Sequence, residues 1–420
     1  MTDVVVVGGG LAGLVTARRL LKSGLRVTVV EASDRLGGNI SRHVVGGITL
    51  DAGAESFATR GGTVQALLGE IGLGGEIVSP NPAGAWLQPT SGPAVPLPAT
   101  SLLGIPGVPA AADVITVIGT RAALRAYLGD TLLPTRVGAK SETLGQLVRA
   151  RMGDAMVDKL VAPVVQGVHS ASPDDLALDR VAPQLRAALH RERTLAGAVR
   201  TIRAAAPAGS AVLGIRGGLV RIVDELVADV THLGAEIRLN SRATAVAPGE
   251  VRVGGDTLRG AVVVATSGLL VGDRQPPRTV TLATLVLDSP ALDAAPRGTG
   301  VLVAEGAAGI RAKALTHATA KWEWLAERAG GKHVVRLSYA SDHQGLAEIA
   351  REDAAALLGV PLEPSAVLDF ARVQWSRAAV SEVVPEGIVV VGEAIAGTGL
   401  ANIIGHSEAQ AKALLSNHAG

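Results

Sequence analysis

The sequence VVVVGGGLAG, residues 4–13, decides the fold of the first part of the chain. Val4–Val7 is a continuous apolar run, typical of a parallel strand that is buried on both faces. Leu14–Ser23 has apolar residues at helical spacing and ends at Gly24, a residue that favours helix termination. A second apolar strand follows at residues 27–30. The pattern predicts a strand–helix–strand unit with a right-handed crossover.

Three glycines in this turn, Gly8, Gly10 and Gly13, match the pattern G-x-G-x-x-G. The first allows a tight turn, the second lets the backbone approach a pyrophosphate, and the third lets helix and strand pack closely. The free N–H groups at the N-terminus of the helix favour a negative group. The pattern predicts a dinucleotide site, and the alternative is a glycine turn in another kind of α/β protein.

An acidic residue and a second glycine pair follow this unit. Glu31 closes the second strand 18 residues after the last glycine of the turn, where a carboxylate can bind a ribose hydroxyl. Next come Arg35, which can reach a phosphate, and the run Gly37-Gly38-Asn39. NAD-binding folds do not need a second glycine pair here, whereas flavoproteins of the glutathione-reductase type do. The arrangement therefore favours FAD over NAD.

The composition excludes several classes of protein. The 420 residues contain no cysteine, so there is no disulfide, thiolate metal site, cysteine nucleophile or cysteine-linked flavin. We therefore expect non-covalent FAD and no metal. A net charge of +1 gives no indication of nucleic acid binding. Because the chain shows no signal peptide and no apolar run of about 18 residues, we expect a cytoplasmic protein, with peripheral membrane contact left open.

The rest of the chain changes character several times. Residues 79–112 are rich in proline and glycine and are expected to form a loop or irregular hairpin, and residues 113–206 carry helical patterns. Arg186, Arg193 and Arg200 recur at seven-residue spacing, which indicates a solvated helix face or a surface for carboxylates or anionic lipid. The remaining predicted elements are helices at 219–233 and 345–358, strands at 235–239, 251–253, 261–265, 281–287, 334–339 and 388–391, and a helix that begins at Leu400.

Five segments carry a resemblance that spans nearly the whole chain. They are the N-terminal motif through GGNI at 37–40, DAGAESF at 51–57, VDKLVAPVVQGVHSASPDDLAL at 157–178, THATAKW at 316–322, and VGE with GTGL between 391 and 400. They resemble the bacterial coproporphyrinogen III and protoporphyrinogen oxidases of the flavin amine-oxidase superfamily. The third segment is the most specific, because other amine-oxidase relatives lack it.

The resemblance implies an α/β fold in three parts. A Rossmann-type, glutathione-reductase-like FAD-binding domain would be discontinuous, formed by residues 1–85, 207–270 and 376–420. A helical domain at 86–206, on the substrate or membrane side, and a mixed-sheet substrate domain at 271–375 would be inserted into it.

The resemblance also implies a set of cofactor-binding residues. GTGL near the C-terminus places another helix N-terminus toward the flavin, where it would stabilise negative charge on the reduced ring. The expected FAD-binding residues are Gly8, Gly10, Leu11, Ala12, Gly13, Glu31, Ala32, Arg35, Gly37, Gly38, Asn39, Gly53, Ala54, Glu55, Ser56, Ala243, Ala265, Trp375, Gly392, Glu393, Gly399 and Leu400.

The implied reaction is oxidation of coproporphyrinogen III to coproporphyrin III in haem biosynthesis, with dioxygen as acceptor and hydrogen peroxide as product. Lys321 is the expected catalytic residue, because it would place a positive charge near the flavin ring. The alternative is a surface lysine beside Trp322 with no catalytic role. Arg60 and His169 are the expected substrate residues. The family's Val-Tyr position is Val168-His169 here.

Further departures from the family leave alternatives open. Residues 376–386 are shorter than the family's equivalent, and the usual substrate-side arginine has no clear match. The alternatives are protoporphyrinogen IX oxidation, another amine-oxidase-type reaction, or a flavin-binding partner protein with reduced catalysis. Only 2% of the residues are aromatic, which argues against a cage of aromatic side chains around an amine substrate. The resemblance also implies a transient contact with a ferrochelatase.

Overall fold

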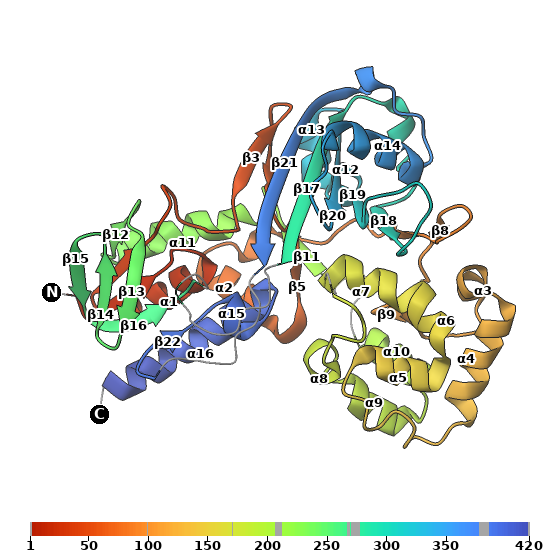
Figure 1. The fold of residues 1–420 in the computed structure, drawn as a ribbon, viewed down its shortest axis with the longest axis horizontal. Helices are drawn as coiled ribbons and strands as arrows, with labels where there is room; N and C mark the ends of the chain where they lie inside the picture. Colours follow the sequence, from red (N-terminus) through yellow and green to blue (C-terminus); the bar gives the residue numbers. More distant parts are fainter. Residues whose placement is uncertain are drawn as a thin grey trace. The chain divides into compact units, whose positions relative to one another are not determined.

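The computed structural model describes residues 2–98, 100–169, 171–205, 212–266, 269, 278–377 and 386–418. The chain divides into two compact units, each built from segments that are far apart in the sequence (Figure 1). Unit 1 comprises Met1–Pro80, Ala211–Val280 and Val373–Gly420, and unit 2 comprises Asn81–Ser210 and Thr281–Arg372. Among the described helices, none combines the length and hydropathy that a membrane span requires.

A five-stranded parallel sheet forms the centre of unit 1. Its strand order is β12-β2-β1-β16-β22, so the strand nearest the N-terminus lies in the middle. Every residue of β1 and β2 is buried, as expected for a parallel sheet that is covered on both faces. The strands are β1 (Val4–Val7), β2 (Val27–Val30), β12 (Glu236–Arg238), β16 (Ala261–Val264) and β22 (Val389–Val390).

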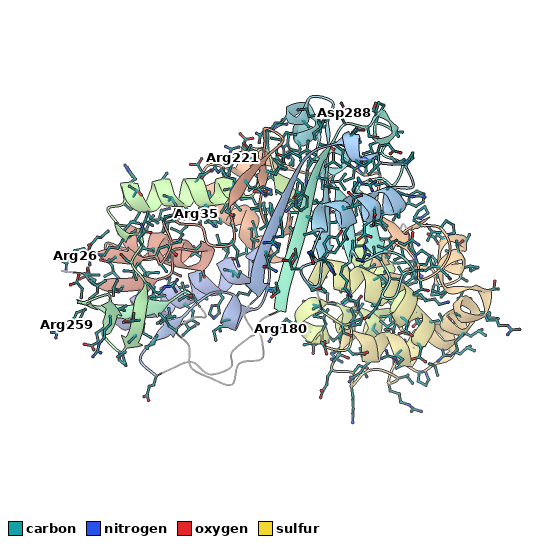
Figure 2. The ribbon with its side chains drawn as sticks, turned by 45° about the horizontal axis from the view of Figure 1, so that its top comes forward. Arg26, Arg35, Arg180, Arg221, Arg259 and Asp288 are labelled. Carbon is teal, nitrogen blue, oxygen red and sulfur yellow. The ribbon has the colours of Figure 1, made fainter. Side chains whose placement is uncertain are left out.

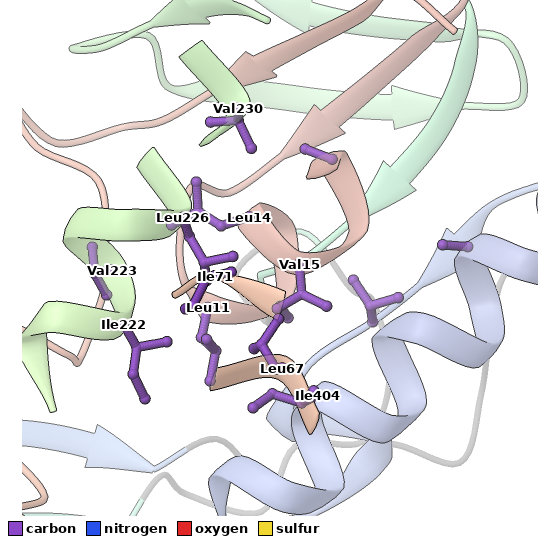
Figure 3. Packing of buried hydrophobic residues seen from close by; sticks show 14 of the residues in the cluster. Leu11, Leu14, Val15, Leu67, Ile71, Ile222, Val223, Leu226, Val230 and Ile404 are labelled. Atoms are coloured by element: carbon purple, nitrogen blue, oxygen red, sulfur yellow. The ribbon is translucent and has the colours of Figure 1, made fainter. Parts of the chain in front are cut away.

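Helices from all three segments of unit 1 share one core. Figure 3 shows Leu14, Leu67, Leu226 and Ile404, from four different helices, within one cluster of buried apolar side chains. Beside this core the buried guanidinium of Arg18 pairs with carboxylates of two other helices. The four helices are α1 (Leu11–Lys22), α2 (Thr63–Glu70), α11 (Val220–His232) and α16 (Leu400–His418).

Smaller elements complete unit 1. An antiparallel three-stranded meander lies in the chain between β12 and β16, and its apolar side chains join a second core on the sheet. The elements are the meander β13 (Ala243–Ala247), β14 (Glu250–Val253) and β15 (Asp256–Arg259), the hairpin β3 (Arg42–Val45) and β4 (Ile48–Asp51), the sheet β5 (Phe57–Ala58), β11 (Val212–Ile215) and β6 (Ile77–Val78), the turns η1 (Arg60–Gly62) and η2 (Gly74–Glu76), and α15 (Glu393–Ala396).

The first segment of unit 2 is mainly helical and has its own apolar core. This segment contains a buried ion pair between Arg151 and Asp130. Their side chains are 0% and 2% exposed, and Nε of Arg151 lies 2.7 Å from Oδ1 of Asp130. The elements are α3 (Ala112–Ile118), α4 (Thr120–Leu132), α5 (Leu144–Met152), α6 (Asp154–Met156), the π-helical turn η3 (Val157–Val161), α7 (Ala162–His169), α8 (Leu178–Val181), α9 (Leu185–Glu192), α10 (Leu195–Ala204), and the hairpin β9 (Ser101–Leu102) and β10 (Ile105–Pro106).

A seven-stranded mixed sheet of order β21-β17-β20-β19-β18-β7-β8 accompanies these helices. Its core includes buried side chains of α14. The elements are β7 (Trp86–Gln88), β8 (Val95–Pro96), β17 (Arg278–Leu287), β18 (Gly300–Val303), β19 (Ala314–His317), β20 (His333–Tyr339), β21 (Val367–Arg377), α12 (Ala318–Lys321), α13 (Glu323–Ala329), α14 (Leu346–Leu358), and the turns η5 (Pro290–Leu292) and η6 (Pro364–Ala366).

The structure differs from the sequence-based prediction in one feature. Residues 79–112 were expected to be loop or irregular hairpin, yet β7 pairs in parallel with β18 and joins the large sheet. The segments 86–206 and 271–375, expected as two domains, fall mostly within a single unit, although each keeps a separate apolar core. The division into three domains therefore stays a prediction.

Candidate functional site

The glycine turn between β1 and α1 is tightly packed against its own backbone. Gly8 has a φ of +107°, which side-chain-bearing residues rarely adopt, and its N–H donates to the carbonyl oxygen of Val30 at 2.8 Å. A Cβ atom on Gly13 would lie 1.9 Å from the carbonyl oxygen of Gly8. Only glycine therefore allows α1 to start this close to β1.

The N-terminus of α1 is suited to an anion. Within the described chain no side chain caps this helix end, and its first turn contains no acidic residue. The first N–H groups of an α-helix have no partner inside the helix, so they are available to a phosphate. A Cβ atom on Gly10 would find a single atom within 4 Å, the Cα of Gly38 at 3.9 Å. Space for a ligand therefore lies beside Gly10.

The second glycine pair forms the other side of this space. The N–H of Gly37 donates to the carbonyl oxygen of Gly9 at 2.8 Å, and Gly37 forms a parallel bridge with Gly10. Gly38 has a positive φ of +57°, and a Cβ atom there would lie 3.3 Å from the Cα of Gly10. Two glycine backbones thus face each other without side chains between them.

The carboxylate of Glu31 is fixed by hydrogen bonds at the end of β2. One of its oxygens, Oε2, accepts from the N–H of Gly9 at 2.8 Å, and the other accepts from the N–H and the hydroxyl of Ser33, each at 2.8 Å. Each carboxylate oxygen accepts about two hydrogen bonds, so Oε2 keeps capacity for a ribose hydroxyl. Ser33 was not predicted from the sequence, because a serine two residues after a strand is not a distinctive signal.

Arg35 takes part in the loop that contains it. Its guanidinium donates to the carbonyl oxygens of Leu36 and Gly38, at 3.3 and 3.1 Å, and Figure 2 shows it within unit 1. These bonds stabilise the turn that brings Gly38 to Gly10. Its contact with a phosphate stays a prediction.

The C-terminal motif reaches the same turn. The N–H of Val391 donates to the carbonyl oxygen of Val264 at 2.9 Å, and this bond extends the sheet toward Gly392. The N–H of Ala265 donates to the carbonyl oxygen of Val7 at 2.8 Å. Gly392 has a φ of +103°, and a Cβ atom there would lie 3.4 Å from the Cβ of Ala12. The structure therefore brings Gly392 and Ala265 together with the glycine turn, from segments that are far apart in the chain.

The segment that follows Gly392 ends at a second helix N-terminus. Glu393 begins the short helix α15, and Gly399, with a φ of +98°, directly precedes Leu400 at the start of α16. A Cβ atom on Gly399 would meet nothing within 4 Å. This second helix start is therefore also open on the side of its preceding glycine.

Asp51 is a residue that the sequence analysis placed in a motif but did not assign to the site. Its carboxylate is 8% exposed and accepts hydrogen bonds from the N–H groups of Leu219 and Val220, at 2.8 and 2.9 Å. It therefore caps the start of α11. Close by in the chain, a Cβ atom on Gly53 would lie 2.9 Å from the carbonyl oxygen of Asn39.

The other predicted residues lie in other elements of the described structure. Ala54, Glu55 and Ser56 lie in the loop before β5, Ala243 begins β13, and Trp375 lies in β21. Ala32 follows Glu31 and is exposed. The backbone of Arg60 lies in η1 and that of His169 in α7, but both side chains lie outside the described part of the structure. No group of three or more His, Asp or Glu side chains in the described residues could hold a metal ion.

Lys321 lies in unit 2, at the C-terminal end of α12. Its side chain is half-buried, and its ammonium lies 5.1 Å from the centre of the Trp322 ring, within cation–π range. Trp322 is 2% exposed, and the carbonyl oxygen of Lys321 accepts from the N–H of Asn81 at 2.9 Å. The lysine is therefore carried by a well-anchored short helix.

A chain of polar side chains leads from the surface to the start of α12. Nε2 of His333 lies 3.0 Å from the exposed carboxylate of Asp293, and Nδ1 of His333 lies 3.2 Å from Nε2 of His317. Because the carboxylate can only accept, His333 donates from Nε2; when His333 is neutral, its Nδ1 accepts from Nε2–H of His317. Burial, together with the charge of His333, lowers the pKa of His317 to about 4, so this imidazole is neutral at pH 7.

The three arginines of the sequence analysis do not lie on one helix, and Arg193 and Arg200 are exposed. Arg186 lies on α9 and donates to Asp179 and to two backbone carbonyls. Arg193 ends α9 with a φ of +65°, and Arg200, on α10, donates to the carbonyl oxygen of Gly107. Because Arg186 and Arg200 bind backbone carbonyls, they stabilise the helical core.

Comparison with known proteins identifies the family. The family model described as flavin containing amine oxidoreductase matches residues 11–295. The chain belongs to this family. As a flavin containing amine oxidoreductase, it is an FAD-dependent oxidase, and its fold is α/β with mixed sheets.

Individual relatives extend this match. The coproporphyrinogen III oxidase of Mycobacterium leprae (strain TN) is 30% identical to this amine oxidoreductase over 454 aligned positions, which cover 94% of each chain. The coproporphyrinogen III oxidase of Propionibacterium freudenreichii subsp. freudenreichii is 29% identical over 271 positions, covering 57% of this chain and 51% of that protein. The latter match therefore spans about half the length of that relative.

Solved structures resemble the whole fold. A crystal structure of a candidate protoporphyrinogen oxidase from Exiguobacterium sp. 255-15 superposes with a TM-score of 0.84, covering 99% of both chains at 22% sequence identity. At this identity the similarity establishes the fold alone.

The geometry of unit 1 fits FAD. The uncapped start of α1, the close approach of the Gly10 and Gly38 backbones without side chains, and the anchored carboxylate of Glu31 suit a pyrophosphate and a ribose. When bound, FAD supplies the redox chemistry of the enzyme, and the protein supplies binding and orientation.

Proposed function

We propose that the protein oxidises coproporphyrinogen III to coproporphyrin III in haem biosynthesis. The observation that supports this most strongly is the relative from Mycobacterium leprae, which bears that activity in its name and matches 94% of this chain at 30% identity. The overall reaction removes six electrons and six protons from the substrate. Three molecules of dioxygen accept them and leave as three molecules of hydrogen peroxide.

We also propose that unit 1 is a Rossmann-type domain of the glutathione-reductase kind. Two observations support this: the parallel strand order with β1 in the middle, and the three-stranded meander that precedes β16 in the chain. The domain boundaries proposed from the sequence are 1–85, 207–270 and 376–420 for the FAD domain, 86–206 for the helical domain and 271–375 for the sheet domain.

Within unit 1 the binding roles follow from the geometry. The N–H groups at the start of α1 would bind the pyrophosphate in the gap beside Gly10, and Glu31 would accept from a ribose hydroxyl through Oε2. The start of α16, behind Gly399, would stabilise negative charge on the reduced flavin. The predicted residues Ala32, Arg35, Ala54, Glu55, Ser56, Ala243, Trp375 and Glu393 would complete the site.

The proposed catalytic residue is Lys321. Its ammonium would stabilise negative charge that develops at the flavin or bind the carboxylates of the substrate, because a positive charge that is already in place needs no reorganisation during the reaction. The ring of Trp322 and the bond from Asn81 hold this lysine in position. Arg60 and His169 are the proposed substrate residues, and contacts with a ferrochelatase and with a membrane surface remain proposals of the same kind.

Protoporphyrinogen IX is the second candidate substrate, because the five sequence segments resemble oxidases of both porphyrinogens. A direct test is aerobic turnover of purified enzyme with each porphyrinogen, read by porphyrin fluorescence and by peroxide release. We expect three peroxides per coproporphyrin and a higher kcat/KM for coproporphyrinogen. Turnover of protoporphyrinogen alone would reverse the assignment, and FAD binding without turnover of either substrate would indicate a flavin-binding partner protein.

A further inference from the structure

Three polar side chains of unit 2 form a chain that leads from the surface into the protein. The side chain of Asp293 is 70% exposed, whereas His333 and His317 are 9% and 1% exposed. Nε2 of His333 lies 3.0 Å from Oδ1 of Asp293, and Nδ1 of His333 lies 3.2 Å from Nε2 of His317. Each link is within hydrogen-bond distance, so protons have a continuous path from the outermost to the innermost side chain.

The sheet places the two imidazoles beside an apolar core. In the register of the sheet, His317 of β19 pairs with Val335 of β20. His333 of β20 pairs with Leu287 of β17, and paired residues share a face of the sheet. Val335 and Leu287 belong to the core that α14 also joins. Bulk water is therefore kept from His317, which exchanges protons only with groups that touch it.

The innermost nitrogen of the chain is an acceptor. Because the carboxylate of Asp293 accepts from Nε2–H of His333, a neutral His333 presents a bare Nδ1, which accepts from Nε2–H of His317. The remaining nitrogen, Nδ1 of His317, is then bare as well. It is buried, and it has no hydrogen-bond partner among the residues that the structure describes. Such an atom is rare in folded proteins and is typical of a catalytic role or of an ordered water.

The inner end of the chain lies next to the helix that carries Lys321. His317 directly precedes α12, and Lys321 ends this four-residue helix, about 6 Å further along its axis at 1.5 Å per residue. The hydroxyl of Thr319 accepts from the N–H of Val334 at 3.1 Å, which fixes α12 to β20 beside His333. His317 and Lys321 therefore belong to one anchored turn of the chain.

We propose that Asp293, His333 and His317 are a proton relay between solvent and the reaction beside Lys321. This inference rests on the proposed function, in which each two-electron cycle takes a hydride from a bridge carbon and a proton from a pyrrole nitrogen of the substrate. Dioxygen later accepts two electrons and two protons and leaves as hydrogen peroxide. One proton is thus released in the first half of the cycle and one is taken up in the second. A path that carries one proton out and one back satisfies this balance.

The outward passage breaks one N–H bond for each that it forms. As a proton adds to Nδ1 of His317, the Nε2 proton of this ring passes to Nδ1 of His333, and the Nε2 proton of His333 passes to Asp293 and on to solvent. Both rings are left in the opposite tautomer, and the inward passage restores them without rotation of either buried ring. Because burial, together with the charge of His333, lowers the pKa of His317 to about 4, this ring holds an added proton only briefly.

The first test is chemical rescue of the purified holoenzyme. His333→Ala should lower kcat about 100-fold, the low end of the range for one lost proton-transfer group. Added imidazole should restore turnover in proportion to its concentration, because it carries protons through the space that the ring has left. Thiazole, a ring of similar size that binds protons far more weakly, should not restore it. The matched control is His190→Ala, at an exposed histidine of the same unit, which should be silent.

A second test reads the tautomers without turnover. In the nitrogen NMR spectrum of the oxidised holoenzyme with isotope-labelled histidine, we expect a proton on Nε2 of His317 and none on its Nδ1. Asp293→Asn removes the carboxylate that fixes Nε2–H of His333, so both rings should become mixtures of the two tautomers. Because Asp293 is exposed, this test decides the case even if His333→Ala does not fold.

The outcomes separate the relay from the reaction that it serves. Wild-type kcat in His333→Ala, equal rescue by imidazole and thiazole, a proton on Nδ1 of His317 in the wild type, or unchanged tautomers in Asp293→Asn would each overturn the relay alone. An enzyme that oxidises neither porphyrinogen would overturn the proposed function, and the relay with it. Flavin content and circular dichroism would verify that each variant is folded.

Discussion

The carboxylate of Asp51 accepts a hydrogen bond from the backbone N–H of Val220 at 2.9 Å. The two residues belong to different segments of unit 1, at the end of β4 and the start of α11. A second bond, from the N–H of Leu219 at 2.8 Å, uses the other carboxylate oxygen. One side chain therefore satisfies two N–H groups of a helix that has no other side-chain cap among the described residues.

Replacing this cap should destabilise unit 1. Asp51→Ala leaves two buried N–H groups without a partner, and we expect a loss of about 2 kcal/mol in the free energy of unfolding, measured by urea titration. The matched control is Asp224→Ala, a change on α11 itself. It removes the exposed ion pair between Asp224 and Arg42 and should change the free energy of unfolding by less than about 0.5 kcal/mol. Equal effects of the two changes would contradict a capping role for Asp51.

The glycines of the turn should separate cofactor binding from folding. Gly10 has a φ of −75° and a ψ of −176°, and its Cβ direction is open, so Gly10→Val should fold and lose FAD. In Gly13→Val the new Cβ would lie 1.9 Å from a carbonyl oxygen, so this variant should lose both FAD and stability. Flavin absorbance and urea unfolding of the apoprotein measure the two effects. A Gly10→Val protein that retains its flavin would rule out the proposed pyrophosphate position.

Lys321→Met tests the proposed catalytic charge. We expect FAD to stay bound and turnover to fall about 10- to 1000-fold, the range for loss of one electrostatic stabiliser. Stopped-flow measurement of the reductive and oxidative half-reactions would show which step slows. Lys332→Met is the matched control, since Lys332 is exposed in the same unit and should be silent. Wild-type rates in both half-reactions of Lys321→Met would limit this lysine to a structural role.

The stability of the protein should fall in mild acid because of His317. Its pKa is about 4 in the folded protein and 6.5 as its ordinary value, so the folded state binds fewer protons than the unfolded state between these values. Stability from this group is full above pH 6.5 and declines as the pH falls toward 4. We expect a loss of about 2 kcal/mol between pH 7 and pH 5.

A non-titrating substitution isolates this contribution. His317→Gln keeps an amide that can donate to His333, so it should weaken the pH dependence of the urea midpoint between pH 7 and pH 5. His232→Gln, at an exposed position of α11, should leave the pH dependence unchanged. If both variants behaved like the wild type, the acid sensitivity would come from other groups.

The parts of the fold that the sequence predicted are those with strong local patterns. The strands at 4–7 and 27–30, the helix at 219–233 and the strand at 388–391 were confirmed within a few residues, because continuous apolar runs and helical spacing identify them. The hairpin β3–β4 and the long strand β21 were missed. Strand β3 carries exposed residues and β21 lacks a continuous apolar run, so their pairing depends on partners elsewhere in the chain.

The glycine turn was the most predictable part of the site, since the spacing of Gly8, Gly10 and Gly13 directly encodes backbone geometry. The proximity of Gly392 to Ala12 was predicted only through the family resemblance. It depends on the pairing of strands that are far apart in the chain. The cap by Asp51 was missed, since a carboxylate can cap a helix that lies 168 positions away only when the tertiary fold brings them together.

The strand order of unit 1 also determines when its strands can pair during synthesis of the chain. β1 pairs with β2 soon after both are made, but its other edge must wait for β16, whose first residue pairs with Val4 from position 261. At about 5–20 residues per second, this wait lasts on the order of ten to fifty seconds. During that interval a valine strand has one unpaired edge, which favours aggregation of the nascent chain. The glycine turn is thus completed long after it is made, since its neighbour Gly392 lies far later in the chain.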